Sequence, residues 1–120
     1  MRSRRQRRVA ELIHHELSTL LMFKVRDPRV ASVTLTSVDM TADLKRAHVY
    51  YMVLDEAEAE EAQQGLDSAA GFLRRALAAR VELRYTPEII FSLDEAEIQG
   101  RRIDALLDGL DPAAGELSDG

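Results

Sequence analysis

The 120-residue chain has no cysteine and no tryptophan, and only three tyrosines and three phenylalanines. The absence of cysteine excludes disulfides, thiolate-bound metal centres and thiol nucleophiles, and it suits a reducing cytoplasm. The longest apolar run, Val49 to Leu54, is far shorter than the roughly 20 residues that cross a membrane. Apolar residues form 46% of the chain and charged residues 31%, a composition typical of one globular domain.

No cluster of residue types suited to catalysis or metal binding stands out in the sequence. His14 and His15 are adjacent on a predicted helix and point to different sides, and His48 has no ligand partner at a suitable spacing. The six glycines are scattered rather than gathered in a phosphate loop. The acidic run 55–61 lacks the glycine and the alternating ligands of a calcium loop. We therefore predict no cofactor, no metal and no enzymatic activity.

The formal net charge is −5, but the charges are unevenly distributed along the chain. Residues 1–30 carry eight Lys and Arg against three Asp and Glu, and residues 72–90 carry four against two. Residues 55–71 hold six acids and no base, and residues 91–120 hold eight acids and two bases. This asymmetry predicts one basic face and an acidic remainder, because attraction to a polyanion depends on the local field. The simpler interpretation is that the charges only solvate exposed surfaces.

Apolar residues recur at helical spacing over residues 4–23, which predicts an amphipathic helix. Its apolar stripe consists of Val9, Leu12, Ile13, Leu17, Leu20 and Leu21. Arginines crowd the start of this helix, where the helix dipole disfavours cations, and this conflict indicates a functional reason for them. Asp27-Pro28 then ends the helical region, since proline keeps the preceding residue out of helical geometry.

Two strands are predicted at residues 32–40 and 47–54, joined as a hairpin by a short polar connection. In the first strand the apolar alternation changes phase between Leu35 and Val38, which a β-bulge or a strong bend explains. A second helical stretch begins at residue 55, with Gly71 inside it. Glycine within a helix costs about 1 kcal/mol relative to alanine, so we expect a kink or a break into two helices there.

A third strand is predicted at residues 88–93, followed by a short helical pattern at 98–110. The fold class is therefore α+β, in the order α-β-β-α-kink-α-β, with a three-stranded sheet and helices packed on one face. The long helical crossover before the third strand allows that strand to pair in parallel. Residues 1–110 form a single domain, and the acidic tail 111–120 is expected to be disordered.

A series of short segments along residues 4–107 carries a family resemblance. The segments are Arg8-Val9-Ala10-Glu11-Leu12-Ile13, Asp27-Pro28-Arg29-Val30, Val33-Thr34-Leu35-Thr36, Asp43-Leu44, Ala47-His48-Val49-Tyr50, Ala69-Ala70-Gly71-Phe72-Leu73-Arg74, Leu83-Arg84, Pro87-Glu88-Ile89-Ile90-Phe91, Asp94 and Gly100-Arg101-Arg102-Ile103. Each is weak alone, but together and in this order they resemble the ribosome-binding factor A family of small-subunit maturation factors. Ala96 departs from the pattern, where a serine is expected, and puts a local turn or cap in question.

The resemblance implies the fold of a type II KH domain, in agreement with the element order. KH domains clamp a nucleic-acid backbone with a GXXG loop, which this chain lacks. The resemblance implies that Ala69-Ala70-Gly71 replaces the loop as a helix–kink–helix motif, where small residues let a backbone approach closely. The alternative for Gly71 is tight packing against a neighbouring helix.

The resemblance also implies a binding partner, the small (30S) ribosomal subunit near the 5′-terminal helix of its 16S rRNA. It implies support for late maturation and for processing of the pre-16S 5′ end, notably in the cold, and release assisted by a maturation GTPase. We expect a monomeric cytoplasmic protein with no membrane attachment.

Lys and Arg side chains are the candidate contacts to rRNA phosphates, since charge and shape dominate such recognition. The candidates are Arg4, Arg5, Arg8, Lys24, Arg26, Arg29, Lys45, Arg46, Arg74, Arg75 and Arg84. For each one the simpler interpretation is a solvated charge, and Arg29 has the further alternative of ordering the turn after Asp27-Pro28. Tyr50 and Phe72 could stack on bases, although Phe72 is more readily explained as core.

Two other classes of function stay open. The acidic segments 55–61 and 104–119 are compatible with a protein-interaction adaptor that docks a basic ribosomal protein or a GTPase, with incidental RNA contact. An enzyme acting on precursor rRNA ends is the other class, and the missing acid–base or metal constellation argues against it. Nuclease treatment of the partner tests the adaptor hypothesis, because it removes RNA contacts and leaves protein contacts. Turnover of precursor rRNA by the pure protein tests the enzyme hypothesis.

Overall fold

The computed structural model describes residues 2–110 and begins with helix α1 (Arg4–Phe23), which has the predicted bounds. A capping box starts this helix: Ser3 Oγ accepts from the Gln6 amide at 3.1 Å, and Gln6 Oε1 accepts from the Ser3 amide at 2.9 Å. Ile13, Leu17 and Leu20 of the predicted apolar stripe are buried, and Val9 and Leu21 are half-buried. Leu12 stays 39% exposed.

Strands β1 (Thr34–Met40) and β2 (Arg46–Met52) pair antiparallel, and a register shift between Leu35 and Ser37 confirms the predicted bulge. Leu35 and Met40 would point to opposite faces of a regular strand, yet both are buried. The bulge therefore keeps both side chains in the core. β1 begins later than predicted because the 3₁₀ helix η1 (Pro28–Val30) and the turn after it occupy the chain up to Val33.

Strand β3 (Glu88–Leu93) pairs in parallel with β2, from Arg46 opposite Glu88 to Tyr51 opposite Leu93. The sheet is thus mixed, with the order β1-β2-β3. The helix between β2 and β3 gives the chain the length that a parallel connection needs, as the sequence predicts. β2 ends before the predicted limit, and Leu54 beyond it is 80% exposed.

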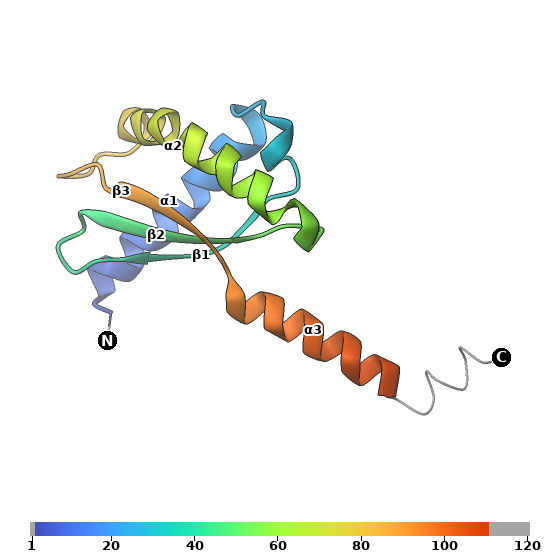
Figure 1. Ribbon diagram of the computed structural model, residues 1–120. Helices are drawn as coiled ribbons and strands as arrows, with labels where there is room; N and C mark the ends of the chain where they lie inside the picture. The colour runs from blue at the N-terminus through green and yellow to red at the C-terminus, as the bar shows by residue number, and fades with distance from the viewer. Residues whose placement is uncertain (1, 111–120) are drawn as a thin grey trace.

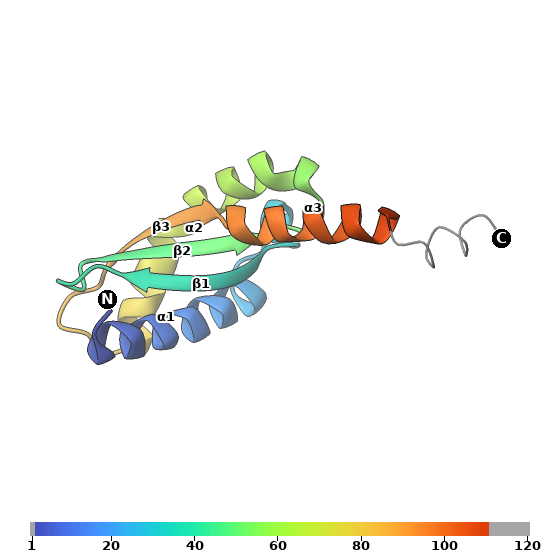
Figure 2. The same ribbon diagram turned by 90° about the horizontal axis from the view of Figure 1, so that it is seen from below.

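Helix α2 (Ala59–Arg80) is one continuous helix that passes through Gly71, so the expected alternative of two separate helices is wrong. The expected kink is confirmed by the change of direction between its first half (green) and its second half (yellow) in Figures 1 and 2. The 3₁₀ helix η2 (Glu56–Glu58) occupies the segment where the sequence predicts the first turn of this helix.

Helices α1 and α2 contact one another and the sheet, so they cover the same face of it (Figure 1). The core between them and the sheet is built from Ile13, Leu17, Leu20, Met40, Ala47, Val49, Tyr51, Leu66, Leu73, Leu77, Ile89 and Phe91. Gly65 sets how closely α2 approaches η1: a Cβ at this position would lie 2.8 Å from Val30 Cγ1 and 3.0 Å from Arg29 Cβ. Only glycine permits this packing without a shift.

Helix α3 (Glu95–Leu110) leaves the end of β3 and projects away from the two-layer body (Figures 1 and 2). It begins earlier than the predicted residue 98 because Asp94 caps it, with Asp94 Oδ1 accepting from the Glu97 amide at 3.1 Å. Ala96 therefore leaves the cap intact. The predicted tail, residues 111–120, lies outside the described residues. Within residues 2–110, no helix combines the length and the apolarity needed to span a bilayer.

Candidate nucleic-acid interface

Cations from four separate parts of the chain meet at one end of the molecule. The start of α1, the β1–β2 turn and the segment before β3 all lie at the left of Figure 1, close to the second half of α2. We call this cluster the basic end: Arg4, Arg5, Arg8, Lys45, Arg46, Arg74, Arg75 and Arg84. The structure therefore brings most of the predicted phosphate contacts together.

An exposed tyrosine lies at the centre of the basic end. Tyr85 is 45% exposed and lines an open hollow with Lys45, Arg74, Arg75 and Arg84. Lys45 Nζ lies 5.0 Å and Arg84 Cζ 5.4 Å from the centre of its ring, distances at which cations are attracted to an aromatic face. Sequence reasoning considered Tyr50 and Phe72 as stacking residues and missed Tyr85. The available signal was an aromatic residue directly after Arg84 and two residues before Pro87.

A second hollow shares two of these side chains. Arg84 and Tyr85 also border a depression between α1 and the β1–β2 turn, whose rim includes Arg5 and Arg8. Val9, Leu12, Leu44 and Leu83 form its apolar part. Tyr85 thus stands between two adjacent hollows that both carry cations, a surface suited to a ligand with phosphates and flat apolar rings.

Most cations of the basic end are free of carboxylate partners. Among residues 2–110, Arg46 pairs loosely with Glu88 at 3.6 Å, and the other members form no ion pair. Arg74 is instead oriented by the backbone, since its Nη2 donates to the Thr86 carbonyl at 3.0 Å. An unpaired guanidinium keeps its donors available for phosphate oxygens.

Carboxylates also lie at the basic end: Glu82 lines the second hollow, and Asp43 and Asp39 bond to nearby groups. Asp43 Oδ1 accepts from Thr41 Oγ1 at 2.7 Å and from the Lys45 amide at 3.0 Å, and the Thr41 hydrogen bond is the larger cause that lowers the pKa of Asp43. These bonds hold the β1–β2 turn, in which Leu44 has a φ of 61°. Asp39 pairs with Arg2 at 2.6 Å. Asp43 therefore orders the β1–β2 turn.

Three predicted contacts lie elsewhere. Lys24, Arg26 and Arg29 follow the other end of α1, roughly 30 Å along the helix from Arg4 at 1.5 Å per residue. Arg29 Nη2 donates to Asp27 Oδ2 at 2.7 Å and Arg29 Nε contacts both carboxylate oxygens at 3.1 Å. This contact lowers the pKa of Asp27 and supports the alternative that Arg29 orders its turn.

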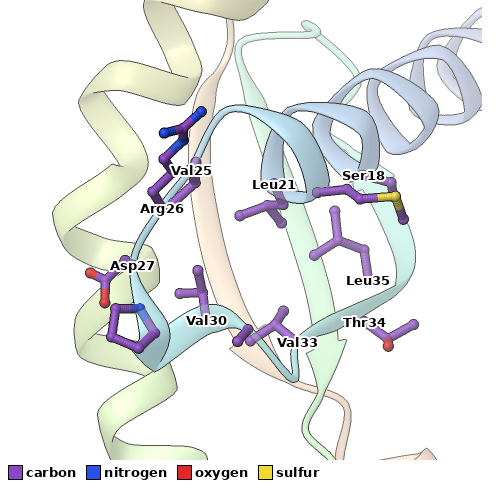
Figure 3. Close-up of a pocket in the computed structure, with 12 residues that line it drawn as sticks. Ser18, Leu21, Val25, Arg26, Asp27, Val30, Val33, Thr34 and Leu35 are labelled. Atoms are coloured by element: carbon purple, nitrogen blue, oxygen red, sulfur yellow. The ribbon is translucent and has the colours of Figure 1, made fainter.

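Arg26 borders an apolar groove between α1, η1 and β1 (Figure 3). Leu21, Val30 and Val33 point into this groove, while the guanidinium of Arg26 points away from them. The groove is distant from Tyr85 and shares none of its lining residues with the two basic hollows. We therefore place it outside the candidate interface.

The Ala69-Ala70-Gly71 motif has an exposed glycine. A Cβ at Gly71 would meet only Arg75 Nη1, at 3.4 Å, so the alternative of tight helix packing is wrong at this position, and Gly65 has that role instead. Phe72 is 40% exposed, so its assignment to the core is also wrong. Leu73 is the residue that packs in the core, and the side chain of Phe72 is rotated about 100° away from it around the helix axis.

The acidic side chains gather at the opposite end. Asp55, Glu56, Glu58, Glu60 and Glu61 belong to η2 and the start of α2, next to where α3 leaves the body (Figure 1). Within residues 2–110, no group of three or more metal-ligating side chains lies together. His14 Nε2 is 3.0 Å from the Leu35 carbonyl, a contact between helix and strand.

The mixed sheet with two helices on one face is a KH-like fold, and the unpaired cations of the basic end form a positively charged surface on it. The chain belongs to the ribosome-binding factor A family, whose model matches residues 5–107. It is 45% identical over 105 residues to ribosome-binding factor A of Limosilactobacillus reuteri, covering 86% of this chain and 88% of the relative. It is 42% identical over 106 residues to the Coxiella burnetii protein, covering 88% and 89%.

Solved structures of the family share this fold. The crystal structure of ribosome-binding factor A from Thermus thermophilus superposes with a TM-score of 0.70 at 26% identity, covering 76% of this chain and 97% of that one. A homology model of the Thermus thermophilus protein, fitted into a cryo-electron microscopy map of a complex of 30S with ribosome-binding factor A, gives a TM-score of 0.55 at 29% identity and covers 70% of this chain and 93% of that one.

Proposed function

We propose that this chain is a non-catalytic assembly factor that binds the small ribosomal subunit through 16S rRNA, and that the basic end makes the contact. The observation that carries the proposal is the convergence of unpaired Lys and Arg side chains around exposed Tyr85. The Thermus thermophilus relative described in complex with 30S supports the choice of partner.

The contact combines charge with stacking. The guanidinium groups of Arg74, Arg75 and Arg84 offer planar donor sets to phosphate oxygens, and Lys45 adds a compact cation. Folded rRNA presents phosphates and 2′-hydroxyls across a shallow minor groove, so shape and charge dominate. Tyr85 adds a ring on which an unpaired base can stack.

Binding energy rather than chemistry gives the factor its effect. A protein that binds one rRNA conformation better than another shifts the population toward the preferred one. The finer parts of the proposal are contact near the 5′-terminal helix of 16S rRNA, support for late maturation and pre-16S 5′-end processing, notably in the cold, and release assisted by a GTPase. Turnover of precursor rRNA by the pure protein would contradict a non-catalytic role.

The direct test is co-sedimentation with isolated small subunits over a salt series, with large subunits as the control. The variant Arg74→Gln/Arg75→Gln removes two free cations of the basic end. Each lost phosphate contact lowers the slope of log K against log salt by about 0.7–0.9, so we expect a decrease of about 1.4–1.8 for the pair. Wild-type protein should bind small subunits selectively.

The matched control is Lys24→Gln/Arg26→Gln, which removes the same charge from the other end of α1. We expect this variant to retain wild-type affinity and salt dependence. If both double variants weakened binding equally, the general charge of the protein rather than the basic end would be responsible. If nuclease-treated subunits bound as well as intact ones, an adaptor that contacts ribosomal protein would replace the RNA-binding proposal.

A further inference from the structure

The first half of α3 is fixed to the body of the molecule. Ile98 is only 4% exposed, and Arg101 Nη2 donates to the Val53 carbonyl at 3.1 Å. Arg102 makes a bidentate contact to Glu56, with Nε at 3.1 Å and Nη2 at 2.8 Å from its two carboxylate oxygens. This contact lowers the pKa of Glu56. The direction in which α3 projects is therefore set by packing and hydrogen bonds.

The second half of α3 exposes an apolar stripe. Ile103, Leu106 and Leu107 are 53%, 64% and 58% exposed. Their spacing of three and four residues places them on one side of the helix. Single exposed leucines are common on protein surfaces, but an aligned set on a projecting helix marks an interaction surface.

An acidic row runs beside the stripe. Glu97, Asp104 and Asp108 are separated by seven and four residues, so they lie along the same side of α3. Beyond Arg102 the described part of the helix has no Lys or Arg. The outer half of α3 therefore combines an apolar stripe with charges of one sign, opposite in character to the basic end.

We propose that the outer half of α3 is a docking site for a basic amphipathic helix of a partner protein. The partner's apolar ridge would pack on Ile103, Leu106 and Leu107, and its Lys or Arg residues would face the acidic row. This inference goes beyond the proposed function, because it concerns a different surface and a different class of partner.

Charge and area exclude other occupants. RNA would be repelled by Asp104 and Asp108. A second copy of the chain would place one acidic row against another. The area that two turns of helix can bury is also far smaller than the roughly 1,200–2,000 Å² buried in a stable protein interface. The same small area makes docking weak by itself. It becomes effective when the basic end is already bound to RNA, since tethering raises the local concentration of the partner.

The test is a titration of the ¹⁵N-labelled full chain with a synthetic peptide of about 18 residues, long enough to form a helix. The peptide carries Leu at helical spacing with Lys beside it, and a matched peptide has Glu in place of each Lys. We expect amide shifts confined to α3 with the Lys peptide, and none with the Glu peptide. Leu106→Gln/Leu107→Gln should weaken binding about tenfold or more.

The control variant Met22→Gln/Phe23→Gln replaces exposed apolar residues at the end of α1 and should bind the Lys peptide as wild type does. Because Leu106 and Leu107 are exposed, circular dichroism should show both double variants folded. Equal response to both peptides, or shifts centred on the apolar groove, would overturn the proposal. If the wild-type protein self-associated and Leu106→Gln/Leu107→Gln abolished that association, the apolar stripe would instead be a contact surface between two copies of the chain. Loss of naked 16S rRNA affinity in that variant would assign it to RNA.

Discussion

The side-chain amide of Gln6 donates a hydrogen bond of 3.0 Å to the backbone carbonyl of Met40, the last residue of β1. Gln6 is 7% exposed although it lies within a run of arginines, and its Oε1 accepts from the Ser3 amide. One neutral side chain therefore caps α1 and ties it to the sheet. This contact fixes the position from which Arg5 and Arg8 project.

Gln6→Ala should reduce both stability and RNA affinity without any change in charge. The buried Met40 carbonyl loses its partner, which costs about 1–3 kcal/mol, and the amide of the exposed residue Ser3 loses its capping bond. We expect this loss in the free energy of unfolding from urea titrations. Small-subunit affinity should fall as well, because the start of α1 is no longer held. Unchanged stability would show that water replaces the amide without cost.

The same substitution at two glycines of α2 should have opposite effects. Gly65→Ala places a methyl group 2.8 Å from Val30 Cγ1, and such overpacking costs about 1–3 kcal/mol. Gly71→Ala meets only the end of the Arg75 side chain and should stabilise the helix by up to about 1 kcal/mol. Thermal unfolding of both variants checks the signs. A destabilising Gly71→Ala would show that the bend in α2 requires glycine.

Asp94 makes stability depend on pH in the acidic range. Thr36 Oγ1 donates to Asp94 Oδ2 at 2.5 Å, and the Glu97 amide donates to Asp94 Oδ1. These two hydrogen bonds, the one from Thr36 first, lower the pKa of Asp94 below its value in the unfolded chain. Its contribution is therefore complete above the unfolded pKa of about 3.9 and is lost as pH falls through the lower folded pKa.

Two variants separate charge from capping at this position. Asp94→Asn should flatten the stability profile below about pH 4 and keep most of the stability at neutral pH, since asparagine is also a good cap. Asp94→Ala should cost about 1 kcal/mol at neutral pH through loss of the cap. Denaturant titrations at several pH values measure both. Identical pH profiles for wild type and Asp94→Asn would show that ionisation of Asp94 does not contribute to the loss of stability in acid.

Tyr85→Ala should weaken binding to single-stranded RNA about tenfold, because stacking on an aromatic ring contributes about 1–3 kcal/mol per base. Tyr85→Phe keeps the ring and should bind as wild type does. The salt dependence should stay constant in both, since no cation is removed. Fluorescence anisotropy with a labelled RNA measures these values. Phe72→Ala is the matched control at an exposed aromatic outside both hollows, and an equal loss there would rule out a specific role for Tyr85.

Local patterns were sufficient to predict much of the fold. The bounds of α1 follow from its apolar stripe, and the phase change in β1 indicated a bulge or a strong bend, of which the structure has the bulge. The length of the helix before β3 allowed the parallel pairing that the structure shows. Each of these signals comes from a few neighbouring residues or from the length of the segment that connects two strands.

The features that sequence reasoning missed depend on distant partners. Gly65 matters because η1 packs against it, and Asp94 begins α3 early because Thr36, far away in the sequence, holds its carboxylate. Tyr85 becomes prominent only when the β1–β2 turn brings Lys45 to its ring. The neighbouring Leu73 suggests a core position for Phe72, whereas the rotation of α2 decides its exposure.

The separation of cations and carboxylates along a molecule 60 Å long gives the described part of the chain a large electric dipole moment. In the proposed complex, the negatively charged rRNA surface would therefore exert a torque on the protein and orient its basic end toward the RNA, with α3 on the far side. At physiological ionic strength the field is screened beyond about 8 Å, so this alignment acts only in the last stage of approach. Added salt should slow association for two reasons. It weakens the attraction, and it lets more molecules arrive in unproductive orientations.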